Sequence, residues 1–168
     1  MRFRFKFDKH YEIKDKLLDL INHAPYTKID SKDVISKTDY YINGLEKDYI
    51  DYIRPQIINF LYECFKNHKI AGYEVSNMWF QQYYKNDIHK WHTHKNTHFT
   101  CVYFVEMPDS DQKTLIRNFG SEDLIEYEAE EGDIIIFPAF LSHASPYLTS
   151  DNRKTIISFN LDIRSDEV

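Results

Sequence analysis

The sequence has few of the residues that build disulfide-rich, zinc-knuckle or disordered proteins. Its 168 residues include only two cysteines, four glycines and five prolines. Cys64 and Cys101 lie far apart and form no CxxC motif, so we expect neither a disulfide framework nor a zinc knuckle. No low-complexity run occurs, and disorder is therefore not expected. This use of cysteine is typical of a reducing compartment, and we expect a cytoplasmic protein.

Long apolar runs and an excess of positive charge are also missing. No stretch reaches the roughly 18 apolar residues that mark a transmembrane helix. The first seven residues, MRFRFKF, alternate charged and aromatic side chains, whereas a signal peptide needs an unbroken apolar stretch. The formal net charge of -6 argues against a protein that binds nucleic acids or membranes electrostatically. We therefore expect neither partner, and the sequence indicates no particular oligomeric state.

Aromatic and aliphatic residues are abundant, and their spacing predicts the secondary structure. With 13 tyrosines and 12 phenylalanines there is enough apolar material for one core, so we expect a single domain, residues 1–168. Residues 2–7 alternate as a strand does, and apolar residues repeat with the helical period up to residue 23 and across 45–68. From about residue 72 the period becomes two. This predicts up to eight strands, at roughly 73–84, 90–94, 97–107, 114–118, 123–129, 133–137, 142–147 and 153–163.

Helices followed by many short strands predict a protein of the α+β class that is mostly β. Residues 71–168 carry enough strands for a jelly roll, also called a double-stranded β-helix. Residues 1–70 would then pack on it as a supporting strand and helices.

Four of the eight histidines lie within residues 89–98. Residues i and i+2 of a strand point to the same side, so His92 and His94 project together and could share a metal ion. His143 follows the apolar strand DIIIF and a proline-containing turn, and strands two and seven of a jelly roll are neighbours. The spacing thus predicts three ligands on one face of a metal. The alternative is a set of solvated histidines. The candidates for the third ligand are Asp87, His89, His98 and His143.

The last predicted strand begins with a charged residue among apolar neighbours. By alternation Arg153 shares a face with Thr155, Ile157 and Phe159. An arginine inside a barrel needs an anion, and a carboxylate ligand suits the guanidinium group, with a hydroxyl added by Thr155. The alternative is an exposed strand end.

Other residues near the histidine pair are candidates for supporting roles. Trp79, Gln81 and Tyr83 alternate onto one face just before the motif, and Tyr83 is the one we single out. A turn is expected at residues 95–96, which would place His98 at the polar rim of the site. His89 has the other parity, and we expect it at the surface or facing the substrate.

Three stretches of the sequence resemble the 2-oxoglutarate- and Fe(II)-dependent oxygenases. They are WFQQYYKNDIHKWHTHKNTHFTCVYFV, EGDIIIFPAFLSH and RKTIISFNL, which together span about residues 78–163. Their order and spacing look like those of the small 2OG-Fe(II) oxygenases that are common in tailed phages and marine bacteria and are related to prolyl 4-hydroxylases. The helical N-terminal part adds little to the resemblance.

The resemblance implies a double-stranded β-helix that holds Fe(II) through His92, His94 and His143. It implies 2-oxoglutarate as cosubstrate and O2 as oxidant, with the distal carboxylate of 2-oxoglutarate on Arg153. The activity would be that of a dioxygenase, an oxidoreductase, which hydroxylates a peptide residue such as proline or a small molecule. If a phage encodes the chain, its compartment would be the host cytoplasm. Further contacts to the cosubstrate, the ligands or the substrate would come from Thr155, Tyr83, Trp79, Gln81, His98, Val102 and Phe104.

Two positions depart from the pattern of the family. Most relatives carry His-x-Asp or His-x-Glu where this chain has His94, and a third neutral ligand leaves the site one negative charge short. The subgroup often has Tyr-Tyr where this chain has Tyr103 and Phe104, so one hydroxyl contact to 2-oxoglutarate would be missing. Two alternatives are a cupin-like three-histidine metalloenzyme without 2-oxoglutarate and a jelly-roll binding module that is not an enzyme.

Overall fold

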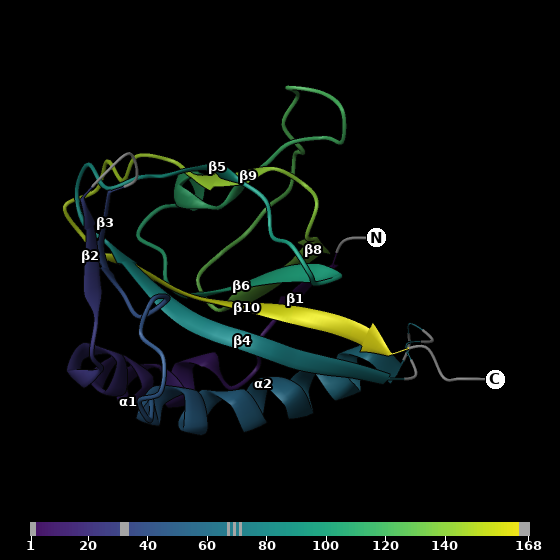
Figure 1. Ribbon diagram of the computed structural model, residues 1–168, viewed down its shortest axis with the longest axis horizontal. Helices are drawn as coiled ribbons and strands as arrows, with labels where there is room; N and C mark the ends of the chain where they lie inside the picture. The colour runs from purple at the N-terminus through teal and green to yellow at the C-terminus, as the bar shows by residue number, and fades with distance from the viewer. Residues whose placement is uncertain (1–2, 31–33, 67, 69, 71, 165–168) are drawn as a thin grey trace.

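Two helices, a large sheet and a small sheet form three stacked layers (Figure 1). The computed structural model describes residues 3–30, 34–66, 68, 70 and 72–164. The helices are α1 (His10–His23) and α2 (Asp48–Lys66), and a short 3₁₀ turn spans Ser110–Gln112. The strands are β1 (Phe3–Lys6), β2 (Thr27–Asp30), β3 (Val34–Thr38), β4 (Gly72–Tyr83), β5 (His89–His92), β6 (Phe99–Glu106), β7 (Leu115–Ile116), β8 (Asp133–Pro138), β9 (His143–Ser145) and β10 (Lys154–Arg164).

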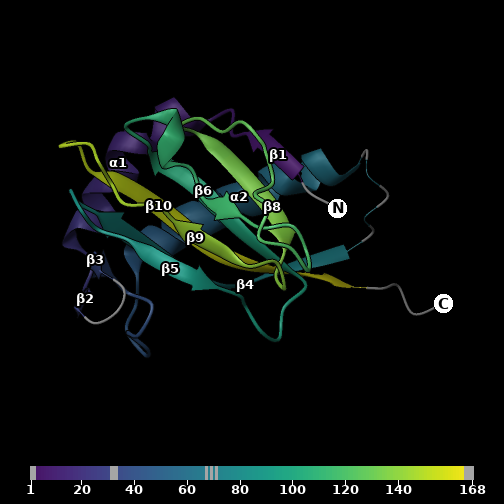
Figure 2. The ribbon, with the colours of Figure 1, turned by 90° about the horizontal axis from the view of Figure 1, so that it is seen from above.

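Both sheets are antiparallel and they face each other. Seven strands form the large sheet in the order β1-β8-β6-β10-β4-β3-β2, and three form the small sheet in the order β5-β9-β7. In Figure 1 the helices lie below the large sheet and the small sheet lies above it. Figure 2 shows β5 and β9 lying over the large sheet. This is the predicted α+β, mostly β arrangement, with the helices packed on the sheet.

Strand β10 is buried on both faces, because a core lies on each side of the large sheet. Ile157, Phe159 and Leu161 join the apolar stripes of α1 and α2 in one core. Ile156, on the opposite face, belongs to a second core between the two sheets. Alternation along β10 therefore separates a helix side from a side that faces the small sheet.

The structure differs from the predicted elements at two places. Residues 123–129 do not form a strand, and an isolated bridge between Arg117 and Leu124 is the only strand-like pairing described for this segment. Ile125 and Tyr127 nevertheless pack on the core between the sheets. The alternation thus marked which side chains are buried, although no neighbouring strand completes a ladder. Conversely, the hairpin β2–β3 was not predicted, and it extends the large sheet beyond β4.

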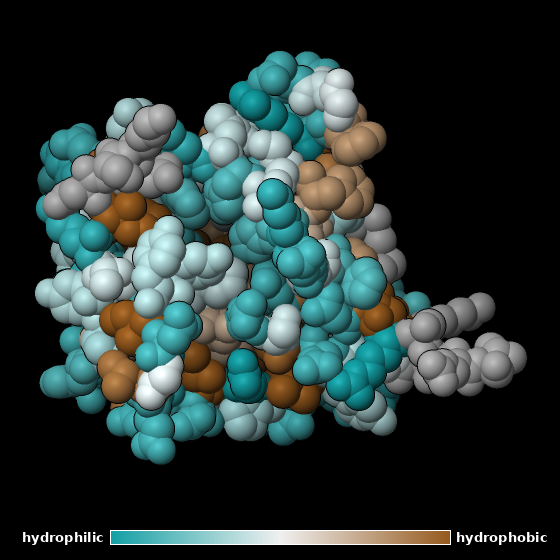
Figure 3. Space-filling model, in the orientation of Figure 1, coloured by the Kyte–Doolittle hydropathy of each residue, from teal (hydrophilic) through white to brown (hydrophobic). Residues whose placement is uncertain are grey.

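The face of the molecule seen in Figure 3 is covered mostly by hydrophilic residues, with hydrophobic residues showing in smaller areas. No helix in the described part of the chain is both long and apolar enough to span a membrane. Some large aromatic side chains are nevertheless exposed. Two of them, Tyr40 and Tyr41, border the pocket described next.

Candidate metal centre

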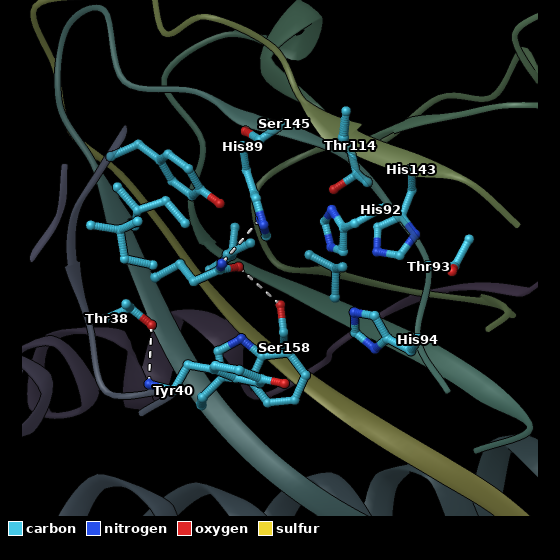
Figure 4. A pocket seen from close by; sticks show the side chains of 18 of the residues that line it. Thr38, Tyr40, His89, His92, Thr93, His94, Thr114, His143, Ser145 and Ser158 are labelled. Carbon is cyan, nitrogen blue, oxygen red and sulfur yellow. Dashed lines mark hydrogen bonds between the residues drawn. The ribbon is translucent and has the colours of Figure 1, made fainter. Parts of the chain in front are cut away.

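Three histidine side chains converge between the two sheets (Figure 4). Strands β5 and β9 pair so that His92 lies directly opposite His143. His94 follows β5, and its backbone N–H donates to the carbonyl of Ala139 at 3.0 Å, which holds this segment beside the turn between β8 and β9. One ring nitrogen from each of the three histidines lies within 4.8 Å of the other two. The structure therefore brings together the three residues that the sequence singled out.

Hydrogen bonds to the outer nitrogens define which nitrogen of each ring faces inward. Nδ1 of His92 lies 2.7 Å from the carbonyl oxygen of Lys90, and Nδ1 of His143 lies 3.0 Å from that of Leu141. A carbonyl oxygen can only accept, so in the neutral ring Nδ1 carries the proton. Nε2 then keeps the lone pair that a metal requires.

His94 follows the same pattern with a side-chain acceptor. Its Nδ1 lies 2.9 Å from Oδ1 of Asn160 on β10. The three rings together offer three neutral nitrogen donors, which fit a divalent transition metal such as Fe(II). No aspartate or glutamate occurs among the described residues that line the pocket.

Burial favours the neutral form of two of these imidazoles. It lowers the pKa of His143 well below its usual value, and the neighbouring His92 lowers it further. Burial also lowers the pKa of His94, although the hydrogen bond to Asn160 acts in the opposite direction. Only a neutral imidazole coordinates a metal. The fold therefore presents both rings in the form that binds.

The histidines lie on one wall of a pocket of about 220 Å³. Four residues expected near the site line this pocket: Trp79, Gln81, Tyr83 and Val102. The mouth is aromatic, because the ring of Tyr40 packs edge-on against Trp79 and against Tyr41, with centroid distances of 5.0 and 4.9 Å. The pocket thus combines a polar, histidine-rich wall with an aromatic rim.

Two further expected residues do not line the pocket. Phe104 is fully buried in the core between the sheets. His98 lies away from the cluster, with its side chain 62% exposed and its Nδ1 3.1 Å from the carboxylate of Asp162. Tyr103 faces the helix side, and its hydroxyl is hydrogen-bonded to Nδ1 of His10 at 2.7 Å.

His89 lies in the pocket although its parity differs from that of His92. The pairing of β5 with β9 shifts register between these two residues, and such a bulge breaks the simple alternation of sides. The two rings stack with centroids 3.9 Å apart. Nδ1 of His89 also lies 3.3 Å from the side-chain amide of Gln81, whose oxygen accepts from Ser158. Of the two positions left open by the sequence, the structure favours the one that faces the pocket.

Arg153 and Thr155 lie on the opposite side of the large sheet from the histidines. Nε and Nη2 of Arg153 lie 2.8 and 3.0 Å from the two carboxylate oxygens of Glu106, and the Thr155 hydroxyl donates to the same carboxylate. Neither residue is among those that line the pocket. The alternation that grouped them with Ile157 and Phe159 is correct, but their shared face packs on the helices. Their expected position inside the site is therefore wrong.

Lys154, between these two residues, points to the side of the large sheet that faces the histidines. The sequence pattern had not identified it as a site residue. Its ammonium group donates to the hydroxyl of Ser145, which lines the pocket, at 2.9 Å. It also lies 5.3 Å from the ring centroid of Tyr83. Burial lowers the pKa of Lys154 to about 7. No carboxylate pairs with it in the described part of the chain, so an anion bound nearby would find a partner there.

A comparison with family models agrees with this geometry. The model described as "Putative 2OG-Fe(II) oxygenase" matches residues 77–160, half of the chain. The chain belongs to this family. The oxygenase is accordingly an oxidoreductase that uses Fe(II), 2-oxoglutarate and O2. A search of curated proteins found no match.

Several solved structures share the fold of this oxygenase. The viral collagen prolyl hydroxylase of Paramecium Bursaria Chlorella virus-1, in its 2OG complex, is 16% identical, with a TM-score of 0.59 and coverage of 98% of this chain and 96% of that chain. The Trichoplax adhaerens prolyl hydroxylase, in complex with a hypoxia inducible factor peptide fragment, is 12% identical, with a TM-score of 0.64 and coverage of 96% and 83%. HygX from Streptomyces hygroscopicus, with nickel and 2-oxoglutarate bound, is 7% identical, with a TM-score of 0.64 and coverage of 96% and 82%. These likenesses confirm the predicted double-stranded β-helix.

Proposed function

We propose that this oxygenase hydroxylates a peptide residue, such as proline, or a small molecule, and that His92, His94 and His143 hold its iron. The observation that carries the proposal is the arrangement of the three rings. Each has an oxygen within hydrogen-bond distance of Nδ1, and one nitrogen of each lies within 4.8 Å of the others. When bound, Fe(II) and 2-oxoglutarate supply the oxidising chemistry. The chain supplies the ligands, the orientation and the pocket.

Lys154 takes the place of Arg153 as the proposed partner of the distal carboxylate of 2-oxoglutarate. Lys154 is 1% exposed, and its ammonium group lies against Ser145 and the ring of Tyr83, both of which line the pocket. A charge-assisted hydrogen bond to a carboxylate would satisfy this buried cation. The hydroxyl groups of Ser145 and Tyr83 are the neighbouring groups that would complete the anion site.

The aromatic rim of the pocket favours a substrate with a ring or another compact apolar group. Tyr40, Tyr41 and Trp79 present aromatic surface there, which suits contact with such a group. Ser158, Gln81 and His89 form a hydrogen-bonded row on the adjacent wall, and this row would orient polar groups of the substrate. The peptide complex of the Trichoplax adhaerens enzyme supports including peptides among the candidates.

Succinate formation from 2-oxoglutarate, measured across a panel of prolyl peptides and small molecules, tests this proposal. A substrate should stimulate succinate formation and gain one oxygen atom, as mass spectrometry detects. His143→Gln should abolish the activity, whereas His98→Gln should retain it because His98 lies outside the cluster. Stimulated succinate formation without oxygen in the product would contradict hydroxylation. Equal losses in the two variants would contradict the ligand assignment.

A further inference from the structure

We propose that Asn160 is the positioning residue that makes His94 a metal ligand, by accepting a hydrogen bond from its Nδ1–H and so turning the lone pair of Nε2 toward the cluster. The inference rests on the proposed three-histidine site. It adds a role for a residue of β10 that does not itself line the pocket and has no described hydrogen bond to the other two histidines.

The three rings are not held in the same way. His92 and His143 each bond to a backbone carbonyl two residues earlier in the chain, Lys90 and Leu141. Local backbone geometry therefore fixes both of these tautomers. His94 depends on a side chain that is 66 residues away in sequence. Of the three rings, His94 is therefore the one whose orientation a single side-chain substitution can release.

Asn160 sits in a rigid setting. Its side chain is buried, with 8% exposed, and its backbone pairs with Thr100 on β6 and Ser76 on β4. The pairing with β6 keeps its register through Phe159 and Asn160, and the extra residue in the pairing with β4 is Asn77 of β4, so β10 alternates regularly at this point. Since residues i and i+2 of a strand share a face, the amide of Asn160 lies on the side of the sheet that carries the pocket residue Ser158.

An asparagine amide can present either an acceptor or a donor to an imidazole. With Oδ1 toward His94, the ring keeps its proton on Nδ1 and Nε2 is free to coordinate. With the amide nitrogen in that place, the ring would carry its proton on Nε2 and could not bind a metal through that atom. The acceptor oxygen of Asn160 thus decides whether His94 completes a three-nitrogen site that lacks a carboxylate.

The tautomer of His94 can be read directly in the metal-free protein. Two-bond 1H–15N correlation spectra of histidine-labelled protein at pH 8 should show His94 with its proton on Nδ1, with the signals assigned by their loss in His94→Gln. In Asn160→Leu the proton should redistribute toward Nε2. A wild-type His94 protonated on Nε2 would overturn the proposal, and so would an unchanged tautomer in Asn160→Leu. This readout involves neither iron nor 2-oxoglutarate, so its failure is distinct from a failure of the proposed activity.

Metal affinity provides the second readout. Asn160→Leu should weaken Co(II) binding about tenfold to a hundredfold, the usual effect of losing the partner of a ligating histidine. Asn160→Asp keeps the acceptor and should bind within a few-fold of the wild type at pH 8. Thr100→Val is the matched control, because Thr100 is a buried cross-strand neighbour of Asn160 whose hydroxyl has no described partner.

Equal affinities of Asn160→Leu and the wild type would overturn the proposal. An Asn160→Asp protein that is folded but binds as weakly as Asn160→Leu would also overturn it, because the acceptor would then be irrelevant. If Asn160→Leu does not fold, the wild-type tautomer and the affinity of Asn160→Asp decide the question.

Discussion

The guanidinium group of Arg153 forms a two-point ion pair with the carboxylate of Glu106, at 2.8 and 3.0 Å, on the helix side of the large sheet. The next residue, Lys154, points the other way and reaches Ser145 on the wall of the pocket. The chain itself therefore neutralises the first cation, whereas the second has no described acidic partner. The first stabilises the fold, and the second is available to a bound anion.

Replacing each cation separately should distinguish these roles. Lys154→Met should weaken 2-oxoglutarate binding about 30-fold or more, because losing one member of a buried charge pair costs about 2–5 kcal/mol. Arg153→Gln should leave that affinity unchanged and instead lower the free energy of unfolding. Anaerobic titration of the Fe(II) protein with 2-oxoglutarate, followed by its charge-transfer absorption, measures the affinities. A loss in Arg153→Gln with none in Lys154→Met would reverse the assignment.

The affinity for 2-oxoglutarate should also depend on pH through Lys154. Burial lowers the pKa of this ammonium group to about 7, and a carboxylate beside it would raise that pKa again. The complex then holds more protons than the free protein, so affinity should fall as the pH rises above about 7. Both carboxyl groups of 2-oxoglutarate stay ionised in this range. The dissociation constant of 2-oxoglutarate should rise between about pH 6.5 and 9 in the wild type, and it should stay constant in Lys154→Met.

Metal binding should depend on pH in the opposite direction. Protons compete with a metal for imidazole, and a free histidine is half protonated at about pH 6.5. Burial lowers the pKa of His94 and of His143, so these ligands charge only at more acidic pH. Co(II) occupancy should therefore persist at neutral pH and fall only at a pH below the usual histidine pKa of about 6.5. Occupancy that never falls while the folded protein is acidified would contradict ligation by histidine, and His98→Gln should follow the wild-type curve.

The sequence predicted which residues of β10 share a face, but it did not predict which face meets the pocket. The first eight of the eleven residues of this strand are buried, because one face packs on helices and the other on the small sheet. When both faces are buried, alternation does not separate inside from outside. A subtler signal was present. Ser158 and Asn160 continue the face of Lys154 with polar groups, whereas the face of Arg153 and Thr155 continues with the apolar residues Ile157, Phe159 and Leu161, as a core requires.

The histidine cluster was easier to predict than the position of His89. His92 and His94 are two residues apart, and His143 lies on the strand that pairs with β5. The folded structure keeps both relations. The register shift between His89 and His92 leaves no trace in the order of residues, since a bulge depends on how two strands fit together. Parity counted across such a shift therefore fails, and only the three-dimensional pairing brings His89 into the pocket.

Gly132 provides a stability prediction far from the metal site, where α1 packs on the sheet. Its φ is +89°, and an added Cβ would lie 3.0 Å from two ring atoms of His10. The backbone cannot easily move away, because the Gly132 N–H donates to the carbonyl of Phe104 and its own carbonyl accepts from Phe7. Gly132→Ala should therefore lose both the backbone freedom of glycine and the fit against His10.

The control for this substitution is Gly120→Ala, which shares a positive φ of +73° but has no atom within 4 Å of the added Cβ. The control should cost only the left-handed conformation, about 1–2 kcal/mol. Gly132→Ala should cost more, because crowding adds to the same conformational penalty. Urea denaturation of the two variants and the wild type measures the difference. Equal losses would show that the ring of His10 moves aside freely, and that its contact with Gly132 does not restrict how α1 sits on the sheet.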